Sequence, residues 1–206
     1  MKFMDVRDVD VDGALCTISR SGYTGEDGFE ISLPAMDASR VARKLLEQPA
    51  VKLIGLGARD SLRLEAGMCL YGSDIDETTT PVEAALEWSI QKSRRRGGAR
   101  EGGFPGADVI LAQLEEGVSR RRVGLLPEGR APVRGGAPLY ADVEFATPLG
   151  KVTSGAFGPT VEAPVAMAYV ATDYAAPQTP IVAELRGRAV PATVHVLPFV
   201  PARFKR

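Results

Sequence analysis

Residues 91–103, Gln-Lys-Ser-Arg-Arg-Arg-Gly-Gly-Ala-Arg-Glu-Gly-Gly, divide the sequence into two parts of different character. The stretch is charged, rich in glycine and free of large apolar residues, so we expect a linker whose arginines are solvated. Strand-like and helix-like patterns are mixed before it, and short β-like runs dominate after it. The sequence therefore predicts an α+β domain over residues 1–90, a linker with a short helix over 91–117, and an all-β domain over 118–206.

The α+β part contains two strand-like runs, residues 13–20 and 29–33, on either side of a loop with three glycines, residues 21–28. The first run is rich in β-forming residues and the second alternates strictly between apolar and polar residues. We therefore expect the two runs to pair as a hairpin. The loop between them permits close approach of a ligand, because glycine has no side chain.

Helical patterns follow the hairpin. The first starts after Pro34 and places Val41, Leu45 and Leu46 on one face that should be buried. A second helix is expected over residues 58–66, where Gly67 provides a stop.

A third helix is expected to start at Pro81, because Thr80 and Glu83 have the spacing of a capping box.

Beyond residue 118, prolines and glycines separate short β runs at intervals of roughly ten to fifteen residues, which is typical of a small antiparallel barrel or sandwich. Of these two we expect the barrel. The fold class is thus α+β, with an incomplete ferredoxin-like α+β domain followed by a small antiparallel β-barrel domain. The expected strands are residues 121–125, 139–145, 151–154, 165–170, 181–185 and 192–196.

The composition excludes several classes of function. The 25 Lys and Arg residues against 26 Asp and Glu give a net charge of −1, so we expect neither a nucleic-acid partner nor a membrane. The cysteines Cys16 and Cys69 make no disulfide framework; we expect both to be buried in a protein of a reducing compartment. The single histidine, His195, lies in a strand-like run, so no metal site and no His-based triad is expected within the chain.

Two charged residues stand where chemistry is possible. Glu30 lies inside the second strand, beside the glycine-rich loop, where its carboxylate could accept two parallel N–H bonds from the edge of a pterin or guanine. The alternative is an exposed strand glutamate. Arg59 lies at a helix start, where the helix dipole disfavours a cation, so it needs a partner: Asp60, Glu30 or an anionic ligand. In the run Arg120–Arg122, alternation places Arg121 on the opposite face from its two neighbours.

Several long strings of residues resemble those of one family. Residues 21–34, 56–68 and 69–83 are similar to the aminomethyltransferase, or T-protein, of the glycine cleavage system, and shorter strings at 121–124, 152–155 and 198–201 extend the resemblance over the whole chain. The wider tetrahydrofolate-dependent family includes dimethylglycine and sarcosine oxidase modules. Two other functions therefore stay open, namely the folate domain of such an oxidase and a non-catalytic folate-binding or interaction module.

The resemblance implies a transferase. It would take the aminomethyl group carried on the lipoyl arm of its partner, the H-protein, release ammonia and leave 5,10-methylenetetrahydrofolate. Tetrahydrofolate would be the co-substrate, and no metal is implied. We expect the bacterial cytoplasm as the compartment, with the mitochondrial matrix as the alternative.

The resemblance also implies the residues of a folate pocket. Glu30 would anchor the pterin, Tyr23 and Arg59 would line the same pocket, and other members would come from both parts of the chain: Met68, Arg122, Phe204 and Arg206. The family's aspartate at the reacting folate nitrogens has no counterpart in the chain. We therefore expect a C-terminal portion of a longer protein, with the catalytic aspartate upstream of Met1, no catalytic residue of its own and little activity alone.

Overall fold

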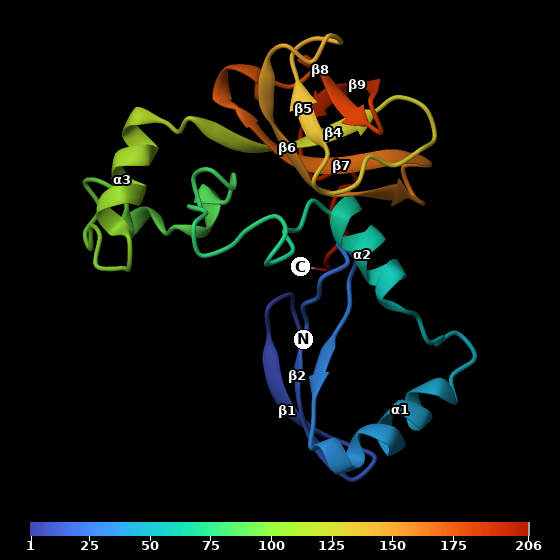
Figure 1. Ribbon diagram of the computed structural model, residues 1–206. Helices are drawn as coiled ribbons and strands as arrows, with labels where there is room; N and C mark the ends of the chain where they lie inside the picture. Colours follow the sequence, from blue (N-terminus) through green and yellow to red (C-terminus); the bar gives the residue numbers. More distant parts are fainter. Residues whose placement is uncertain (206) are drawn as a thin grey trace.

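The computed structural model describes residues 1–205 and shows a small sheet unit and a β-barrel joined by helix α2 (Figure 1). The sheet unit contains β1 (Val6–Val11), β2 (Ala14–Ser19), β3 (Glu30–Ser32), α1 (Ala38–Leu46) and α2 (Leu56–Glu65). A linker segment leads through α3 (Ala107–Glu116) to the barrel strands, which are β4 (Arg120–Pro127), β5 (Pro138–Tyr140), β6 (Pro148–Gly158), β7 (Ala163–Ala171), β8 (Pro180–Leu185) and β9 (Arg188–His195).

The sheet unit is a three-stranded antiparallel sheet in the order β1-β2-β3. The expected hairpin is confirmed, since β2 pairs with β3 so that Thr17 faces Ser32 and Ser19 faces Glu30. Strand β1 on the other side was not expected. None of its residues is buried, so its sequence carries little of the apolar signal that marks a strand.

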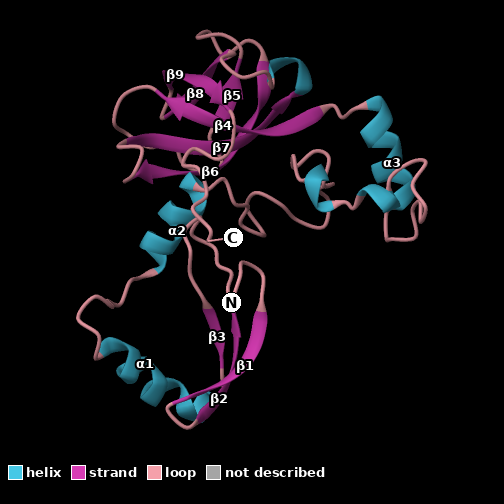
Figure 2. Ribbon diagram, turned by 180° about the vertical axis from the view of Figure 1, so that it is seen from behind, coloured by secondary structure: helices cyan, strands magenta, loops and turns pink. Residues whose placement is uncertain are grey.

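Helix α1 packs through Val41, which is buried against Ala14 and Cys16 of β2. Leu45 and Leu46 were expected on the same buried face, but they are 41% and 37% exposed. The expectation was wrong for these two leucines because the narrow sheet covers only part of the helix. Figure 2 shows α1 crossing the far end of the sheet, away from the barrel.

The helix expected at Pro81 is absent from the described residues, where only turns span 81–85. The capping-box bonds do form, because the Glu83 amide donates to the Thr80 hydroxyl (3.2 Å) and the Thr80 amide to the Glu83 carboxylate (2.9 Å). However, the Glu83 and Ala84 carbonyls accept hydrogen bonds from the Arg122 amide and side chain, at 2.8 and 2.7 Å. Contacts with β4 therefore take the acceptors that a helix would need.

The arginines of the linker are not simply solvated. Arg94 donates to the carbonyl oxygen of Gly102 (3.1 Å), and Arg96 pairs with Glu115 of α3 (2.9 Å). The expectation of a solvated charge run is wrong for Arg94, which is half-buried because the glycine turns bring carbonyl groups within reach of its guanidinium. It holds for Arg96, whose side chain stays 57% exposed in its pair with Glu115. The linker is thereby folded against its own helix.

The barrel is closed, with strand order β4-β7-β6-β5-β8-β9 and β9 returning to β4. Each of the six expected β runs falls within one of these strands or overlaps it, which confirms the barrel rather than the sandwich. No helix of the described residues 1–205 combines the length and apolar character that crossing a bilayer requires.

Strand β7 connects the barrel core to α2. Its alternate residues Ala166 and Ala168 lie in the barrel interior, whereas Val165 and Met167 face outward and pack against Leu64 of α2. A strand that is apolar on both faces must be covered on both. Helix α2 provides the outer cover, so its buried face is decided by β7.

A buried ion pair reinforces this junction. The Arg63 guanidinium of α2 donates to the Asp74 carboxylate at 2.6 Å, and both side chains are almost completely buried. Asp74 also accepts hydrogen bonds from Thr153 and Ser154 of β6, and the Tyr169 hydroxyl of β7 donates to its carbonyl (2.8 Å). The charges thus have partners from both units.

We expect Asp74→Ala to lower the free energy of unfolding by about 3–5 kcal/mol, because it leaves the Arg63 charge buried without its closest partner. Asp60→Ala is the matched control, since Asp60 pairs with the same arginine but its side chain is 51% exposed. The control should cost no more than about 1 kcal/mol. Urea unfolding followed by circular dichroism measures both, and equal losses would contradict the proposed role of burial.

Candidate functional site

The glycine-rich loop is held against the end of α2. Gly25 has a left-handed backbone with φ of 78°, and a Cβ atom on it would lie 2.7 Å from the Cβ of Ala66. Only glycine meets both conditions without a shift of the chain. The loop therefore approaches α2 closely and brings Tyr23 next to the helix.

Tyr23 and Arg59 are in direct contact. The Arg59 guanidinium lies over the Tyr23 ring at 4.4 Å from its centroid, and the Tyr23 hydroxyl donates to the carbonyl oxygen of Cys69. Burial raises the pKa of the Tyr23 phenol. Asp60, one of the partners considered for Arg59, instead pairs with Arg63. Among the described residues, the partner of Arg59 is thus the face of an aromatic ring.

The Glu30 carboxylate is exposed and oriented by serines. One of its oxygens accepts a hydrogen bond from the Ser21 hydroxyl at 2.9 Å, and Ser21 lies 2.8 Å from the Ser19 hydroxyl. Ser19 and Glu30 are also partners across the β2–β3 ladder. A carboxylate has about four acceptor positions, so most stay available to a ligand.

The C-terminal tail lies beside the glycine-rich loop. The Arg203 amide donates to the Gly25 carbonyl (2.8 Å), and its side chain is 3.6 Å from Glu26. The Phe204 ring stacks on Phe3, with centroids 4.3 Å apart. The two ends of the chain therefore meet next to the loop, as both views show (Figures 1 and 2). Arg206, also expected at the site, lies outside the described residues.

Met68 and Arg122 lie on the barrel side of α2. Met68 is half-buried, and its carbonyl oxygen accepts a hydrogen bond from Arg63. Arg122 is buried in β4, where it donates to the carbonyl oxygens of Ala84 (2.7 Å) and Gly67 (3.0 Å). Arg122 thus joins β4 to two other segments of the chain, one at Gly67 and one at Ala84.

A cavity of about 290 Å³ lies beside Arg122 and is also lined by Arg121 and His195. His195 was expected to be structural, and it is half-buried in β9, stacked on Phe199 with ring centroids 5.5 Å apart. Cys16 is buried as expected, whereas Cys69 is only half-buried. Burial nevertheless raises the pKa of the Cys69 thiol.

The structure brings only part of the expected set together. Tyr23 touches Arg59, and Glu30 is tied to the same loop through Ser21, whereas Arg122 is engaged at the barrel junction.

Trp88, 76% exposed, received no role from the sequence pattern. Its signal was only that it is the single tryptophan of the chain. In the described part of the chain, no group of three or more His, Cys, Asp or Glu side chains is placed to hold a metal ion.

Comparison with known protein families agrees with this architecture. Residues 1–94 match the family described as "GCVT N-terminal domain", and residues 120–201 match the "Glycine cleavage T-protein C-terminal barrel domain". The chain belongs to the glycine cleavage T-protein family. The first match covers the sheet unit and the start of the linker, and the second covers the closed barrel.

Individual relatives support the T-protein assignment. The chain is 54% identical over 189 residues to the mitochondrial aminomethyltransferase of Canis lupus familiaris, covering 92% of the chain and 45% of the relative. It is 45% identical to the mitochondrial aminomethyltransferase of Dictyostelium discoideum, and the match covers 100% of the chain and 51% of that relative. The crystal structure of the glycine cleavage system aminomethyltransferase T from Bartonella henselae superposes with a TM-score of 0.90 at 48% identity, covering 100% of this chain and 55% of that one. The T-protein chain thus spans about half the length of these relatives.

Two phenols, the half-buried Tyr23 and the buried Tyr169, predict a loss of stability in alkali. Burial raises the pKa of both Tyr23 and Tyr169 above the ordinary value of 10.0. As pH rises through 10, the unfolded chain therefore loses these protons first, and the free energy of unfolding should fall between about pH 10 and 11.5. Urea titrations at several pH values across this range measure how steeply the free energy of unfolding falls with pH. The fall should be less steep for Tyr169→Phe. A stability that stays constant to pH 11.5 would contradict this expectation.

Proposed function

We propose that this chain supplies the folate-anchoring part of a tetrahydrofolate-dependent aminomethyltransferase of the glycine cleavage system. Such an enzyme transfers the methylene of H-protein-bound aminomethyl-lipoyl to tetrahydrofolate and releases ammonia. Membership of the T-protein family supports the reaction class. The observation that carries the proposal for this chain is the exposed Glu30 carboxylate, held by Ser21 beside the Tyr23–Arg59 pair.

Glu30 has the chemistry that a pterin requires. The pterin ring presents an N3–H and a 2-amino group side by side, and a carboxylate accepts both in two parallel, charge-assisted hydrogen bonds. The bond from Ser21 limits rotation of the carboxylate, so less freedom is lost when the ligand binds. We therefore assign pterin anchoring to Glu30 and its positioning to Ser21.

Tyr23 and Arg59 would form the next part of the pocket. The aromatic ring covers one face of the guanidinium, and the N–H groups in its plane would donate to an anionic or polar group of the ligand. We propose that Met68 and Phe204 contribute apolar surface and that Arg122 holds the wall between α2 and β4. We propose that Arg206 is also a member of the folate pocket, as the family resemblance implies.

We propose that none of the carboxylates near this site is the catalytic one. Asp27 is paired with Arg20, whose side-chain hydrogen bond lowers the pKa of Asp27. Asp60 is paired with Arg63. A carboxylate with a lowered pKa is a poor proton acceptor, since catalytic groups work best near the ambient pH. The chain's own work would be to hold and orient the folate, rather than to support the developing cation.

The lipoylated H-protein is the partner that this function requires. For the compartment, the names of the curated relatives specify mitochondria, which supports the mitochondrial matrix, and the relative of known structure comes from a bacterium, which supports the bacterial cytoplasm.

Glu30→Ala should weaken tetrahydrofolate binding by about 1.5–3 kcal/mol, because the charge-assisted bonds to the pterin are lost. Ser21→Ala should have a smaller effect, about 1 kcal/mol, since it removes only one orienting bond. Glu77→Ala, which removes another exposed glutamate, is the matched control and should leave the affinity unchanged. Calorimetric titration in a protein of the relatives' full length measures all three, and unchanged affinity in Glu30→Ala would refute the assignment.

The transferase proposal is tested by ammonia release from aminomethyl-loaded H-protein with tetrahydrofolate. We expect the 206-residue chain alone to show little turnover, and to gain it when the remaining part of a T-protein is added, because Asp27 and Asp60 are both engaged in ion pairs. Turnover by the chain alone at the rate of an intact enzyme would mean that a catalytic group lies among residues assigned to binding. Folate binding without turnover in the complemented protein would instead indicate a non-catalytic folate module.

A further inference from the structure

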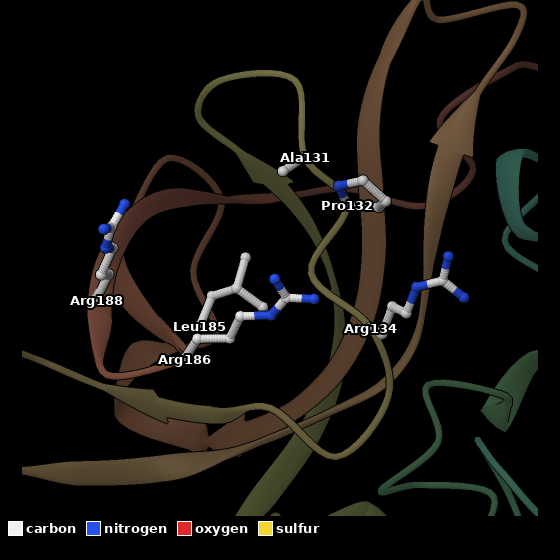
Figure 3. Close-up of a pocket in the computed structure, with 6 residues that line it drawn as sticks. All are labelled: Ala131, Pro132, Arg134, Leu185, Arg186 and Arg188. Carbon is white, nitrogen blue, oxygen red and sulfur yellow. The ribbon is translucent and has the colours of Figure 1, made fainter.

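A cavity of about 700 Å³ opens in the barrel between the β4–β5 loop and the β8–β9 hairpin (Figure 3). It shares no residue with the proposed folate site. Its lining comes from two short stretches of chain, namely Ala131, Pro132 and Arg134 from the loop and Leu185, Arg186 and Arg188 from the hairpin. The cavity is therefore formed by barrel residues alone.

The charge of the lining is one-sided. Three of its side chains are arginines and none is a carboxylate. Within residues 1–205, no carboxylate lies within ion-pair distance of Arg134, Arg186 or Arg188, whereas half of the arginines of the sheet unit and the linker have one. In the view of Figure 3, the Arg186 side chain lies between those of Arg188 and Arg134. Three exposed guanidinium groups that line one cavity without a counter-charge would favour an anion between them.

The backbone holds Arg186 in place at a cost. Leu185 pairs with Arg188 at the end of the ladder, so Arg186 and Gly187 form a two-residue turn. Both have left-handed backbones, with φ of 54° and 73°. Such turns prefer Asn-Gly or Asp-Gly, and a left-handed backbone is unfavourable for arginine. An arginine at this position is a local conflict with turn preference, and such conflicts gather at functional sites.

The rest of the lining is apolar, with Leu185 and Pro132 half-buried behind the charged groups. Guanidinium groups beside apolar surface bind phosphate and carboxylate groups through paired hydrogen bonds. The volume lies within the range of roughly 300–1,000 Å³ that is typical of small-molecule sites. We propose that this cavity binds a small molecule that carries two or more phosphate or carboxylate groups, at a site separate from the proposed folate pocket.

The site suits a small molecule better than a nucleic acid. The net charge of the chain is −1, and the three arginines of the cavity come from one loop and one hairpin rather than from a broad face of the molecule. A cavity with an apolar floor also offers little to a sugar-phosphate backbone. The anion it accepts is therefore compact enough to enter between the loop and the hairpin.

The test is calorimetric titration of the 206-residue chain with two probes, inorganic pyrophosphate and citrate. We expect saturable binding of at least one probe. Stronger binding of pyrophosphate indicates a phosphate ligand, and stronger binding of citrate a polycarboxylate. Arg186→Gln should weaken the preferred probe by about tenfold or more, because a charge-assisted pair is lost. The double variant Arg134→Gln/Arg188→Gln should weaken it further.

Arg43→Gln is the matched control, since Arg43 is an exposed arginine of α1, far from the barrel. It removes one positive charge from the chain and should change the affinity by less than about twofold. Circular dichroism verifies that each variant keeps its fold. Absence of saturable binding for both probes overturns the proposal, and so does an equal loss of affinity in Arg43→Gln and Arg186→Gln, which would show a general charge effect.

Discussion

The arrangement of this molecule depends on one buried ion pair, Arg63 with Asp74. Two charges taken out of water are stable only when their hydrogen-bonding capacity is met, and here Ser154 of the barrel bonds to both partners at 2.8 Å. The pair therefore forms only when α2, the 70–76 segment and the barrel strands occupy their observed positions. This makes the junction specific, whereas apolar contact alone would allow the barrel to shift along the helix.

Because α2 is held in this way, its other residues are placed as well. Glu65 in the last turn accepts hydrogen bonds from Thr160 and Val161 in the β6–β7 turn, at 2.7–2.9 Å. At the opposite end, the first turn presents Arg59 to Tyr23. One helix therefore joins the two units and forms one wall of the proposed folate site. A change in the packing of α2 would therefore alter both the junction of the two units and the proposed folate site.

The sequence by itself determined the local elements and the family. The β2–β3 hairpin, α1, α2 and the barrel strands follow from periodicity, proline and glycine positions, because these signals act over a few neighbouring residues. The strings around Tyr23, Glu30 and Arg59 were long enough to indicate the T-protein family, to which the chain belongs. Their placement on a glycine-rich loop, a strand and a helix start was also predictable.

Only the tertiary structure decided which of these residues meet. The partner of Arg59 is the ring of Tyr23, 36 positions away, and no local pattern distinguishes this from an ion pair with Asp60. The helix expected at Pro81 is replaced by turns because Arg122 takes the carbonyl oxygens of Glu83 and Ala84. The bonds of Ser154 to Arg63 and Asp74 and the arginine-lined cavity likewise join segments that are distant in the chain. Such contacts depend on how the elements pack, and packing is a property of the whole fold that local preferences do not specify.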